Sequence, residues 1–448
     1  MPKKRGGNGK KGKSEALGLS LDPVPSCKQR SACPDAYSDM DEESLAETGS
    51  ITSTFSDHKS TKGDESAEVD ERSQVEILED KLKDAIDLTT QKSSQGRASS
   101  FEILCKAFSM KYLPEFVLGR RMTLLDCVER GLKKGRGAEQ EAAAKLGVLL
   151  CLQLGAIGEA ESVYRECKPI LTQIALDPTA PLPARAQCCT ALGLSCFLAS
   201  NDVEEVSTAL KTFETIFSAF TPGTASNASP ELARLYTSAV AAWNLLLTLL
   251  GARQVYSVCD THIAKFSRLL ESPDVDLRIV SGEAIALLYE GGREFDETYG
   301  FEEEGEKESE VAELCNKLRQ LATDSHKYRA KKDRKQQRSS FRDILRAVEE
   351  NEVPEIKVKF GKEVLELDSW TRKHQYDAFC SLLGSGMNLH LTENEFLRDI
   401  FGLGSPLVVG EGVVSKIPKS TRNYMNMAAF KARSVARSKN RDKRVAMF

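Results

Sequence analysis

The side chains best suited to chemistry in this chain are the cations near its C-terminus. Residues 416–448 hold ten Lys or Arg and a single acid, Asp442. The centre of this run, Ala428–Arg444, contains no Pro or Gly, and its Ala, Arg and Lys content predicts a helix. At about 100° per residue its cations surround the helix, so no apolar stripe is left to face a protein core or a bilayer. The cations that could bind phosphate groups are Lys431, Arg433, Arg437, Lys439, Arg441, Lys443 and Arg444.

A helix charged on every side suits a slot that is walled by phosphate groups. From composition alone, a disordered solvating arm or a nuclear-import signal is the alternative interpretation. The charges are interleaved with helix-forming residues, and this favours the binding helix.

A second basic block, Lys327–Glu350, combines positive charge with an apolar stripe. Seven bases lie between Lys327 and Arg338, where the single acid is Asp333. Apolar side chains recur at helical spacing, namely Phe341, Ile344, Leu345 and Val348. One side of this helix is expected to pack on a core while its flank presents guanidinium groups, which bind phosphate through two hydrogen bonds. The alternative is a solvated charged helix. The candidate contacts are Arg329, Lys331, Lys332, Arg334, Lys335, Arg338 and Arg342, and Arg346 continues the four-residue spacing of the arginines.

Motifs for catalysis or for cofactor binding are weak. Gly7, Gly12, Lys13 and Ser14 match a P-loop, but the flanking residues predict neither the strand nor the helix that such a loop requires. The five His residues are far apart, and no nucleophile motif is present. The twelve Cys residues include no C-x-x-C pair, so neither a zinc site nor a disulfide framework is predicted. We therefore expect a protein that is not an enzyme and has no cofactor, no metal and no small-molecule substrate.

Charge is strongly segregated along the chain. Residues 1–74 begin with a basic run, and residues 35–80 hold fifteen acids against three bases. Residues 1–74 cannot bury enough apolar surface to fold, so a disordered tail is predicted. The polar N-terminus has no signal-peptide pattern, which indicates a reducing compartment. Segregated charge indicates a polyanion partner, and the few aromatic residues among the cations favour phosphate contacts with folded RNA over base stacking.

Residues 75–350 have the pattern of a helical array. Four segments rich in Ala, Gly and Leu begin 44, 48 and 44 residues apart, at Glu139–Leu154, Pro183–Ala199, Glu231–Leu250 and Val275–Tyr289. This is the period of HEAT or armadillo units, so the predicted fold class is mainly α, an armadillo-like or HEAT-like solenoid. The uncharged stretch Leu235–Ala252 approaches the length of a membrane span, but its polar residues favour a buried helix. An irregular helical domain without true repeats is the alternative.

Residues 351–448 form the third predicted part. Glu355–Trp370 alternates as two short strands about a Gly361–Lys362 turn, which predicts a hairpin. Two helices are predicted near Thr371–Leu383 and Thr392–Phe401, separated by GSGMNLHL, and the basic helix 428–444 follows. Because this part is barely large enough for its own core, we expect it to pack on the end of the solenoid.

Several of these segments together resemble the interferon-related developmental regulator family. The resemblance covers about Glu76 to Arg444 and is carried by RRMTLLDCVERGLKKG, LRIVSGEAIALLYE, LATDSHKYRAKKDRKQQRSSFRDILRAVEE, LGSGMNLHLTENEFLRDIFGLG and AAFKARSVARSKNRDKR. It implies an armadillo-like body without catalytic activity. It also implies one of two roles: binding to translationally inactive ribosomes, with the basic C-terminal helix in the mRNA channel, or transcriptional co-regulation through protein complexes.

The resemblance makes ribosome binding and translational repression the first expected function. The partners would be ribosomal RNA and ribosomal proteins, and the channel-entering residues would be those of Ala428–Arg444. Val435 departs from the family pattern, in which relatives tend to carry a base, so one contact is expected to be missing. A nuclear co-regulator that scaffolds repressor complexes is the alternative. We expect the protein in the cytoplasm and the nucleus, without attachment to a membrane.

Overall fold

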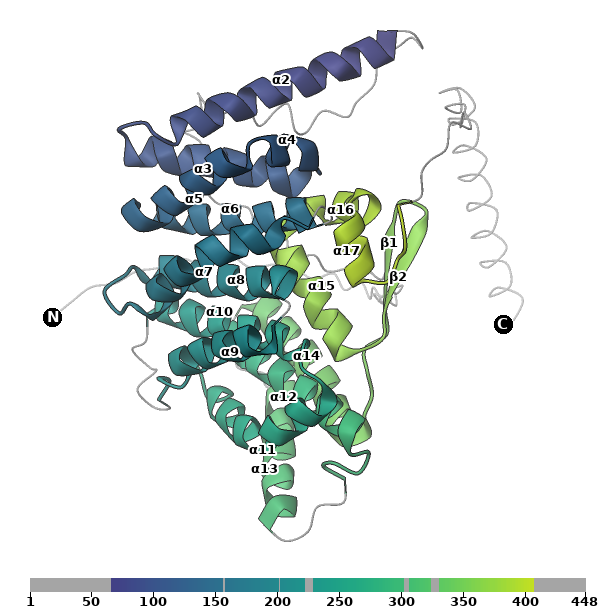
Figure 1. Cartoon of the computed structure of the whole chain (residues 1–448). Coiled ribbons are helices and arrows are strands. Elements are labelled where there is room, and N and C mark those ends of the chain that lie inside the picture. Colours follow the sequence, from purple (N-terminus) through teal and green to yellow (C-terminus); the bar gives the residue numbers. More distant parts are fainter. Residues whose placement is uncertain are drawn as a thin grey trace, which may run out of the picture. The chain divides into compact units, whose positions relative to one another are not determined.

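The structure is a computed structural model of the chain, and it describes residues 66–155, 158–200, 202–221, 229–301, 306–323 and 330–406. All of these residues belong to one compact unit, which is mainly helical (Figure 1). The predicted mainly α fold class is confirmed. The helices before the hairpin are α2 (Ser66–Leu88), α3 (Ser94–Met110), α4 (Pro114–Gly119), α5 (Arg121–Lys134), α6 (Ala138–Leu154), α7 (Ala160–Leu176), α8 (Leu182–Ala199), α9 (Val203–Phe217), α10 (Pro230–Leu247), α11 (Ala252–Leu269), α12 (Val275–Phe295), α13 (Glu306–Thr323) and α14 (Lys331–Glu350).

Four central helices coincide with the predicted repeat. The helices α6, α8, α10 and α12 begin within one residue of the four predicted starts, and successive members of this set contact each other. Most side chains of α6 and α8 are buried on all sides of the helix, as expected for helices without a charged face. Each of α5, α7, α9 and α11 packs against the central helix that follows it, so the array consists of helix pairs stacked in chain order (Figure 1).

Small residues allow the central helices to approach closely. A Cβ atom added to Gly193 of α8 would lie 2.7 Å from the Cβ atom of Ala242 on α10, which is closer than real side chains pack. The uncharged stretch that begins at Leu235 lies mostly in α10, where Leu235, Val240 and Trp243 are buried. Across the described residues, no helix combines the length and the apolar character that crossing a bilayer requires.

The helix α2 begins at Ser66, ahead of the predicted start at Val75. Its Leu78, Leu82 and Ile86 are buried where α2 packs on α3. Residues 1–65 of the predicted N-terminal tail lie outside the described part, and so does the P-loop match around Lys13.

The predicted hairpin is present after α14. Strand β1 (Ile356–Phe360) pairs antiparallel with β2 (Glu363–Leu367), and Phe360 lies opposite Glu363 across a turn in which Gly361 has a positive φ of 51°. Four short elements follow the hairpin: α15 (Trp370–Leu383), the 3₁₀ turn η3 (Gly384–Gly386), α16 (Met387–Glu393) and α17 (Glu395–Ile400).

The segment GSGMNLHL is helical, so its prediction as a separator between two helices is wrong. It forms η3 and the first turns of α16 because Met387, His390 and Leu391 are buried. Two glycines in the segment suggested a loop. A Cβ atom at Gly386 would lie 1.8 Å from the carbonyl oxygen of Ser109, so this glycine is required by the close approach of the α3 backbone.

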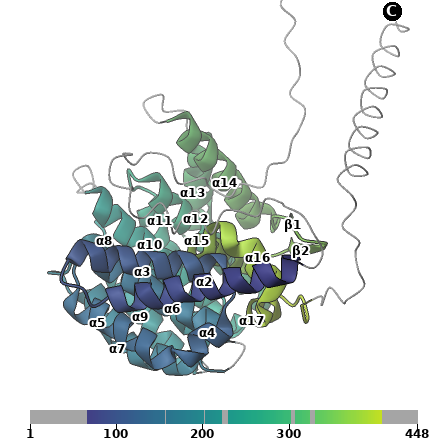
Figure 2. The same ribbon diagram turned by 90° about the horizontal axis from the view of Figure 1, so that it is seen from above.

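The C-terminal region runs back along the array, so the expectation that it packs on the end is also wrong. Helix α15 contacts α10 and α12, while η3 and α16 contact α3 (Figures 1 and 2). The first turn of α15 is fixed by Glu290 of α12, whose carboxylate accepts hydrogen bonds from the backbone N–H groups of Trp370 (2.7 Å) and Thr371 (2.9 Å). Burial raises the pKa of Glu290, and these hydrogen bonds favour the charged form.

A buried polar network joins α16 to α3 and α6. The carbonyl oxygen of Phe108 accepts hydrogen bonds from Gln153 Nε2 (2.8 Å) and from His390 Nε2 (3.2 Å). Asn394 donates to the carbonyl oxygen of Leu152 at 3.2 Å and contacts His390 Nδ1 at 3.4 Å. Burial lowers the pKa of His390 to about 4, so the imidazole is neutral near pH 7 and can donate from one nitrogen while the other accepts.

Replacing Gly386 with Ala should destabilise the protein. The new methyl group would overlap the Ser109 carbonyl, so α16 or α3 must move, at a cost of about 1–3 kcal/mol of unfolding free energy. Urea unfolding followed by circular dichroism measures this loss. The control is Gly119→Ala, because nothing lies within 4 Å of a Cβ atom at that position. Equal unfolding midpoints for the two variants would contradict the close approach.

Candidate nucleic-acid interface

Within the basic block predicted from the sequence, Lys331–Glu350 forms α14, which packs on α12 and α13. Five of its cations lie on one flank, at about 60–140° from Phe341 around the helix axis at 100° per residue. We call this set the basic strip. Four of its members are exposed and Arg338 is half-buried; the members are Lys331, Lys335, Arg338, Arg342 and Arg346.

The other predicted contacts divide into three groups. Lys332 is exposed on a different side of α14. Arg334 is half-buried and its Nε atom is hidden from solvent, because its position on the helix faces the packed side. Arg329 and the predicted contacts of the tail, Lys431 to Arg444, lie outside the described residues.

The charge of the basic strip is largely uncompensated within the described part of the chain. Among the described acids, Glu352 lies at ion-pair distance from the strip, with its Oε2 atom 3.8 Å from Arg346 Nη1. Both of these side chains are more than half exposed, at 58% and 57%, so the pair contributes little stability and leaves Arg346 available to another anion. The Nε atom of Arg338 donates to the carbonyl oxygen of Arg334 at 3.2 Å, which orients its guanidinium group.

The apolar side of α14 packs on α12, as the apolar spacing predicted. Phe341, Ile344 and Val348 are buried, and Leu345 is partly buried against the same core. The contact is close at Gly282 of α12, where an added Cβ atom would lie 2.8 Å from Ile344 Cδ1 and 2.9 Å from Phe341 Cε1. The absence of a side chain at Gly282 therefore lets α14 sit directly on the α12 backbone.

Two buried arginines of α12 fix the position of α14. The first, Arg278, donates to the carbonyl oxygen of Ser272 at 2.6 Å and to Oε1 of Gln337 on α14. Gln337 in turn donates to the carbonyl oxygen of Leu321 at 3.2 Å. Through this one amide side chain, α12, α13 and α14 are joined inside the core.

The second buried arginine, Arg293, holds the C-terminal end of α14. Its Nη1 and Nη2 atoms donate to the carbonyl oxygens of Ala347 and Val348, each at 2.5 Å. Its Nε atom donates to the backbone carbonyl oxygen of Tyr299 at 3.1 Å. The C-terminal end of a helix carries partial negative charge, which a guanidinium group stabilises. The ring of Phe301 covers the guanidinium carbon at 4.0 Å. Burial lowers the pKa of Arg293, but an arginine side chain keeps its charge in this environment.

A third buried arginine, Arg398 of α17, holds the chain where it leads toward the tail. Its guanidinium group forms two hydrogen bonds of 2.8 Å with the Glu363 carboxylate, and these lower the pKa of Glu363. It also donates to the carbonyl oxygens of Leu391 (2.8 Å), Leu403 (3.0 Å) and Gly404 (2.8 Å). The fully buried side chain thus fixes the backbone just before the described residues end at 406.

The structural roles of Arg293 and Arg398 were not predicted from the sequence. A single Arg in a helical segment with apolar neighbours, as in ALLYEGGREF and NEFLRDIFGLG, is the signal that could have found them. A charge at such a position is costly to bury unless several hydrogen bonds surround it.

Groups suited to metal binding or thiol chemistry do not assemble in the described part of the chain. It contains no cluster of three or more His, Cys, Asp or Glu that could hold a metal ion. The cysteines that the structure describes are free thiols, and all but Cys380 are buried. Burial raises the pKa of Cys105 and Cys151 to about 12, so these thiols stay protonated and pack as small apolar groups.

Two family models match this chain. Residues 48–349 match the model "Interferon-related developmental regulator", and residues 394–445 match "Interferon-related protein conserved region". The chain belongs to the interferon-related developmental regulator family. The second match includes Arg398 and every predicted contact of the tail from Lys431 to Arg444.

Relatives within this family align with most of the chain. The mouse protein Interferon-related developmental regulator 1 is 44% identical over 409 residues, which cover 90% of each chain. The mouse protein Interferon-related developmental regulator 2 is 44% identical over 381 residues, which cover 84% of this chain and 85% of the relative. A designed armadillo repeat protein of known structure aligns with a TM-score of 0.36 and 12% identity, covering 60% of this chain and 99% of its own.

Replacing Arg293 with Met should destabilise this family member more than removal of an exposed arginine. The change leaves the Ala347 and Val348 carbonyl groups without their donor inside the core, a loss of about 2–4 kcal/mol in unfolding free energy. Urea unfolding gives the comparison. The control is Arg319→Ala, which breaks a partly exposed ion pair with Glu349 and should cost at most about 1 kcal/mol. If both variants unfold at the same urea concentration, Arg293 does not hold α14.

Proposed function

We propose that this protein is a non-enzymatic, ribosome-binding regulator of translation. In this proposal the basic segment Ala428–Arg444 enters the mRNA channel of inactive ribosomes, while the basic strip of α14 binds ribosomal RNA outside it. The observation that carries the proposal is the basic strip itself. Its cations are presented on a helix whose other side is locked to α12 by Arg293 and Gly282, and little of their charge is compensated by described acids.

Membership of the interferon-related developmental regulator family supports the tail contact. The family model over 394–445 spans both the Arg398 cluster and the tail cations, so the anchor and the basic segment belong to one matched region. Arg398 fixes the backbone at Leu403 and Gly404, shortly before the described residues end at 406.

Phosphate groups are the RNA feature that these residues suit. Members of the basic strip recur every three or four residues, which places successive cations about 5–6 Å apart along the helix. No aromatic residue lies among the exposed positions of α14, so stacking on bases is not available there. Guanidinium and ammonium groups without stacking partners bind the backbone of folded RNA with little dependence on its sequence.

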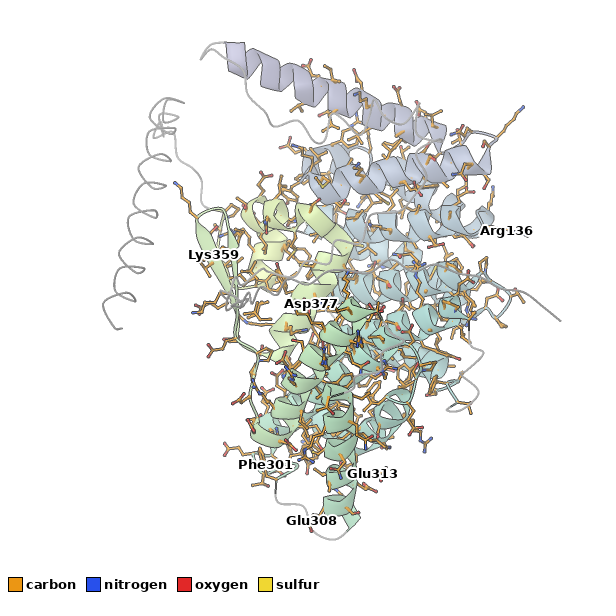
Figure 3. The ribbon with its side chains drawn as sticks, turned by 180° about the vertical axis from the view of Figure 1, so that it is seen from behind. Arg136, Phe301, Glu308, Glu313, Lys359 and Asp377 are labelled. Carbon is orange, nitrogen blue, oxygen red and sulfur yellow. The ribbon has the colours of Figure 1, made fainter. Side chains whose placement is uncertain are left out.

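A nuclear co-regulator that binds proteins is the second candidate, and an acidic, aromatic surface favours it. The exposed rings of Tyr256 and Phe295 lie 4.9 Å apart, beside the exposed carboxylates of Glu294 and Glu297. A cleft of about 310 Å³ is lined by residues that include Phe301, Glu308 and Arg319. Figure 3 labels Phe301 and Glu308 at one end of the described body. Such a surface repels RNA and suits a basic peptide of a partner protein.

Binding to vacant ribosomes should depend steeply on salt. The protein should co-sediment with vacant ribosomes in about 0.1 M salt and be released as salt rises, with a log–log slope of magnitude about 4–6 if most tail cations contact phosphate. Quantitative sedimentation across a salt series gives this slope. Binding that does not change with salt would mean that the contact is mainly hydrophobic, and the phosphate model would fail.

Reversing charge in the tail should abolish inhibition of translation without unfolding the body. The triple change Arg433→Glu, Arg437→Glu and Arg441→Glu replaces attraction to phosphate with repulsion, and truncation after Met427 should act in the same way. Translation of a reporter mRNA in a cell-free extract measures inhibition, and the melting temperature checks folding.

The control for charge reversal is the pair Lys359→Glu and Lys362→Glu, which alters exposed cations on the hairpin. This variant should still inhibit translation. If the tail variants inhibit as fully as the unchanged protein, the tail is not the effector, and the co-regulator becomes the first candidate.

A further inference from the structure

Ser339 is an exposed hydroxyl group within the basic strip of α14. It follows Lys335 by four residues and precedes Arg342 by three, which are the separations at which helical side chains are neighbours. At about 160° from Phe341 around the helix axis, Ser339 borders the sector that holds the strip. The adjacent Ser340 is half-buried and points to another side of the helix. Within the described residues, the Ser339 hydroxyl makes no hydrogen bond.

We propose that Ser339 is a phosphorylation site and that its phosphate switches off the RNA contact of the basic strip. This inference rests on the proposed function, because the strip must first bind RNA. An arginine-directed serine kinase would supply the phosphoryl group from ATP. The Ser339 oxygen forms a bond to the γ-phosphorus, the bond from that phosphorus to the bridging oxygen breaks, ADP leaves, and the hydroxyl proton is released.

The residues around Ser339 suit such a kinase. In RKQQRSSFR, cations lie one, four and five residues before Ser339 and three residues after it, as Arg338, Lys335, Arg334 and Arg342. Carboxylate groups in an arginine-directed kinase would recognise these positions by charge-assisted hydrogen bonds. Three of these cations, Lys335, Arg338 and Arg342, belong to the basic strip. The cations that bind RNA in the unmodified protein would therefore also help to direct the enzyme that turns the contact off.

A kinase would reach Ser339 after the first turns of α14 unwind. Between Lys331 and Ser340 the only buried side chain is Gln337, whereas Phe341, Ile344, Ala347 and Val348 hold the rest of the helix. Unwinding these turns breaks the bonds of Gln337 with Arg278 and Leu321 but exposes little apolar surface. Local opening near a helix end costs less free energy than global unfolding, and here the cost includes the buried hydrogen bonds of Gln337.

Phosphorylation would change the charge of the strip at its middle. A phosphoserine carries about −1.5 to −2 charges at pH 7 and has three acceptor oxygens, so Lys335 and Arg342 would pair with it in place of RNA. Removing about two phosphate contacts lowers the affinity for structured RNA by roughly 10- to 100-fold near 0.1 M salt, because each contact contributes about 0.9 to the log–log slope.

The test treats the full-length protein with arginine-directed serine kinases and ATP, locates phosphate by mass spectrometry, and measures affinity for vacant ribosomes. We expect phosphate at Ser339, and a roughly 10- to 100-fold loss of affinity after modification. Ser339→Asp adds one negative charge without a kinase and should lower the affinity for vacant ribosomes about tenfold. Ser339→Gln adds no charge and should bind with the affinity of the unchanged protein. Ser257→Asp places the same charge on an exposed position of α11 and should leave affinity unchanged.

Two results would overturn the inference: no phosphate at Ser339, or equal affinities for the Ser339→Asp and Ser339→Gln variants. Arg342→Gln separates this failure from failure of the proposed function. That variant should bind about tenfold more weakly if the strip contacts RNA. If Arg342→Gln lowers the affinity for vacant ribosomes and Ser339→Asp does not, the phosphorylation switch is rejected and the RNA contact stands. No loss with either variant rejects the RNA contact of α14 as well.

Discussion

Two opposite charges on one turn of α12, Glu290 and Arg293, organise the C-terminal half of the molecule. The carboxylate of Glu290 accepts hydrogen bonds from the first N–H groups of α15, and the guanidinium group of Arg293 donates to the last carbonyl groups of α14. Each charge therefore meets the helix end of opposite polarity. A charge in a protein interior is tolerated only where several hydrogen bonds surround it, so α14 and α15 have little freedom to dock elsewhere.

This constraint decides where the basic strip and the C-terminal region lie. Because Arg293 and Gly282 fix α14 by its apolar side, the basic strip lies on an exposed flank of the helix and its cations remain available to anions. Because Glu290 fixes the start of α15, the chain returns along the array toward α3. The basic strip and the starting point of the tail thus depend on neighbouring residues of a single helix.

Helix α16, where the C-terminal region reaches α3, is held by neutral polar groups. His390 and Gln153 share the carbonyl oxygen of Phe108, and Asn394 reaches Leu152, so α16 is joined to both α3 and α6. A charged imidazole would lack a counter-ion there, which is why burial holds its pKa near 4. Arg398 then fixes Leu403 and Gly404.

Features that depend on neighbouring residues could be predicted from the sequence, whereas features that depend on contacts between distant residues could not. Periodicity and composition are local, and they predicted the four central helices, the β1–β2 hairpin and the apolar side of α14 with Phe341 and Ile344. The glycines of GSGMNLHL have the pattern of a loop, but Gly386 is needed for the close contact with α3.

The sequence by itself therefore determined the helical class, the repeat and the concentration of cations in α14 and in residues 416–448. Only the tertiary structure decided that Arg293 and Arg398 are structural, that Arg334 is partly hidden, and that the C-terminal region runs along the array. The reason is physical. Arg293 binds carbonyl groups of α14 that lie more than fifty residues away, and Arg398 pairs with the Glu363 carboxylate thirty-five residues away. No local pattern records those partners.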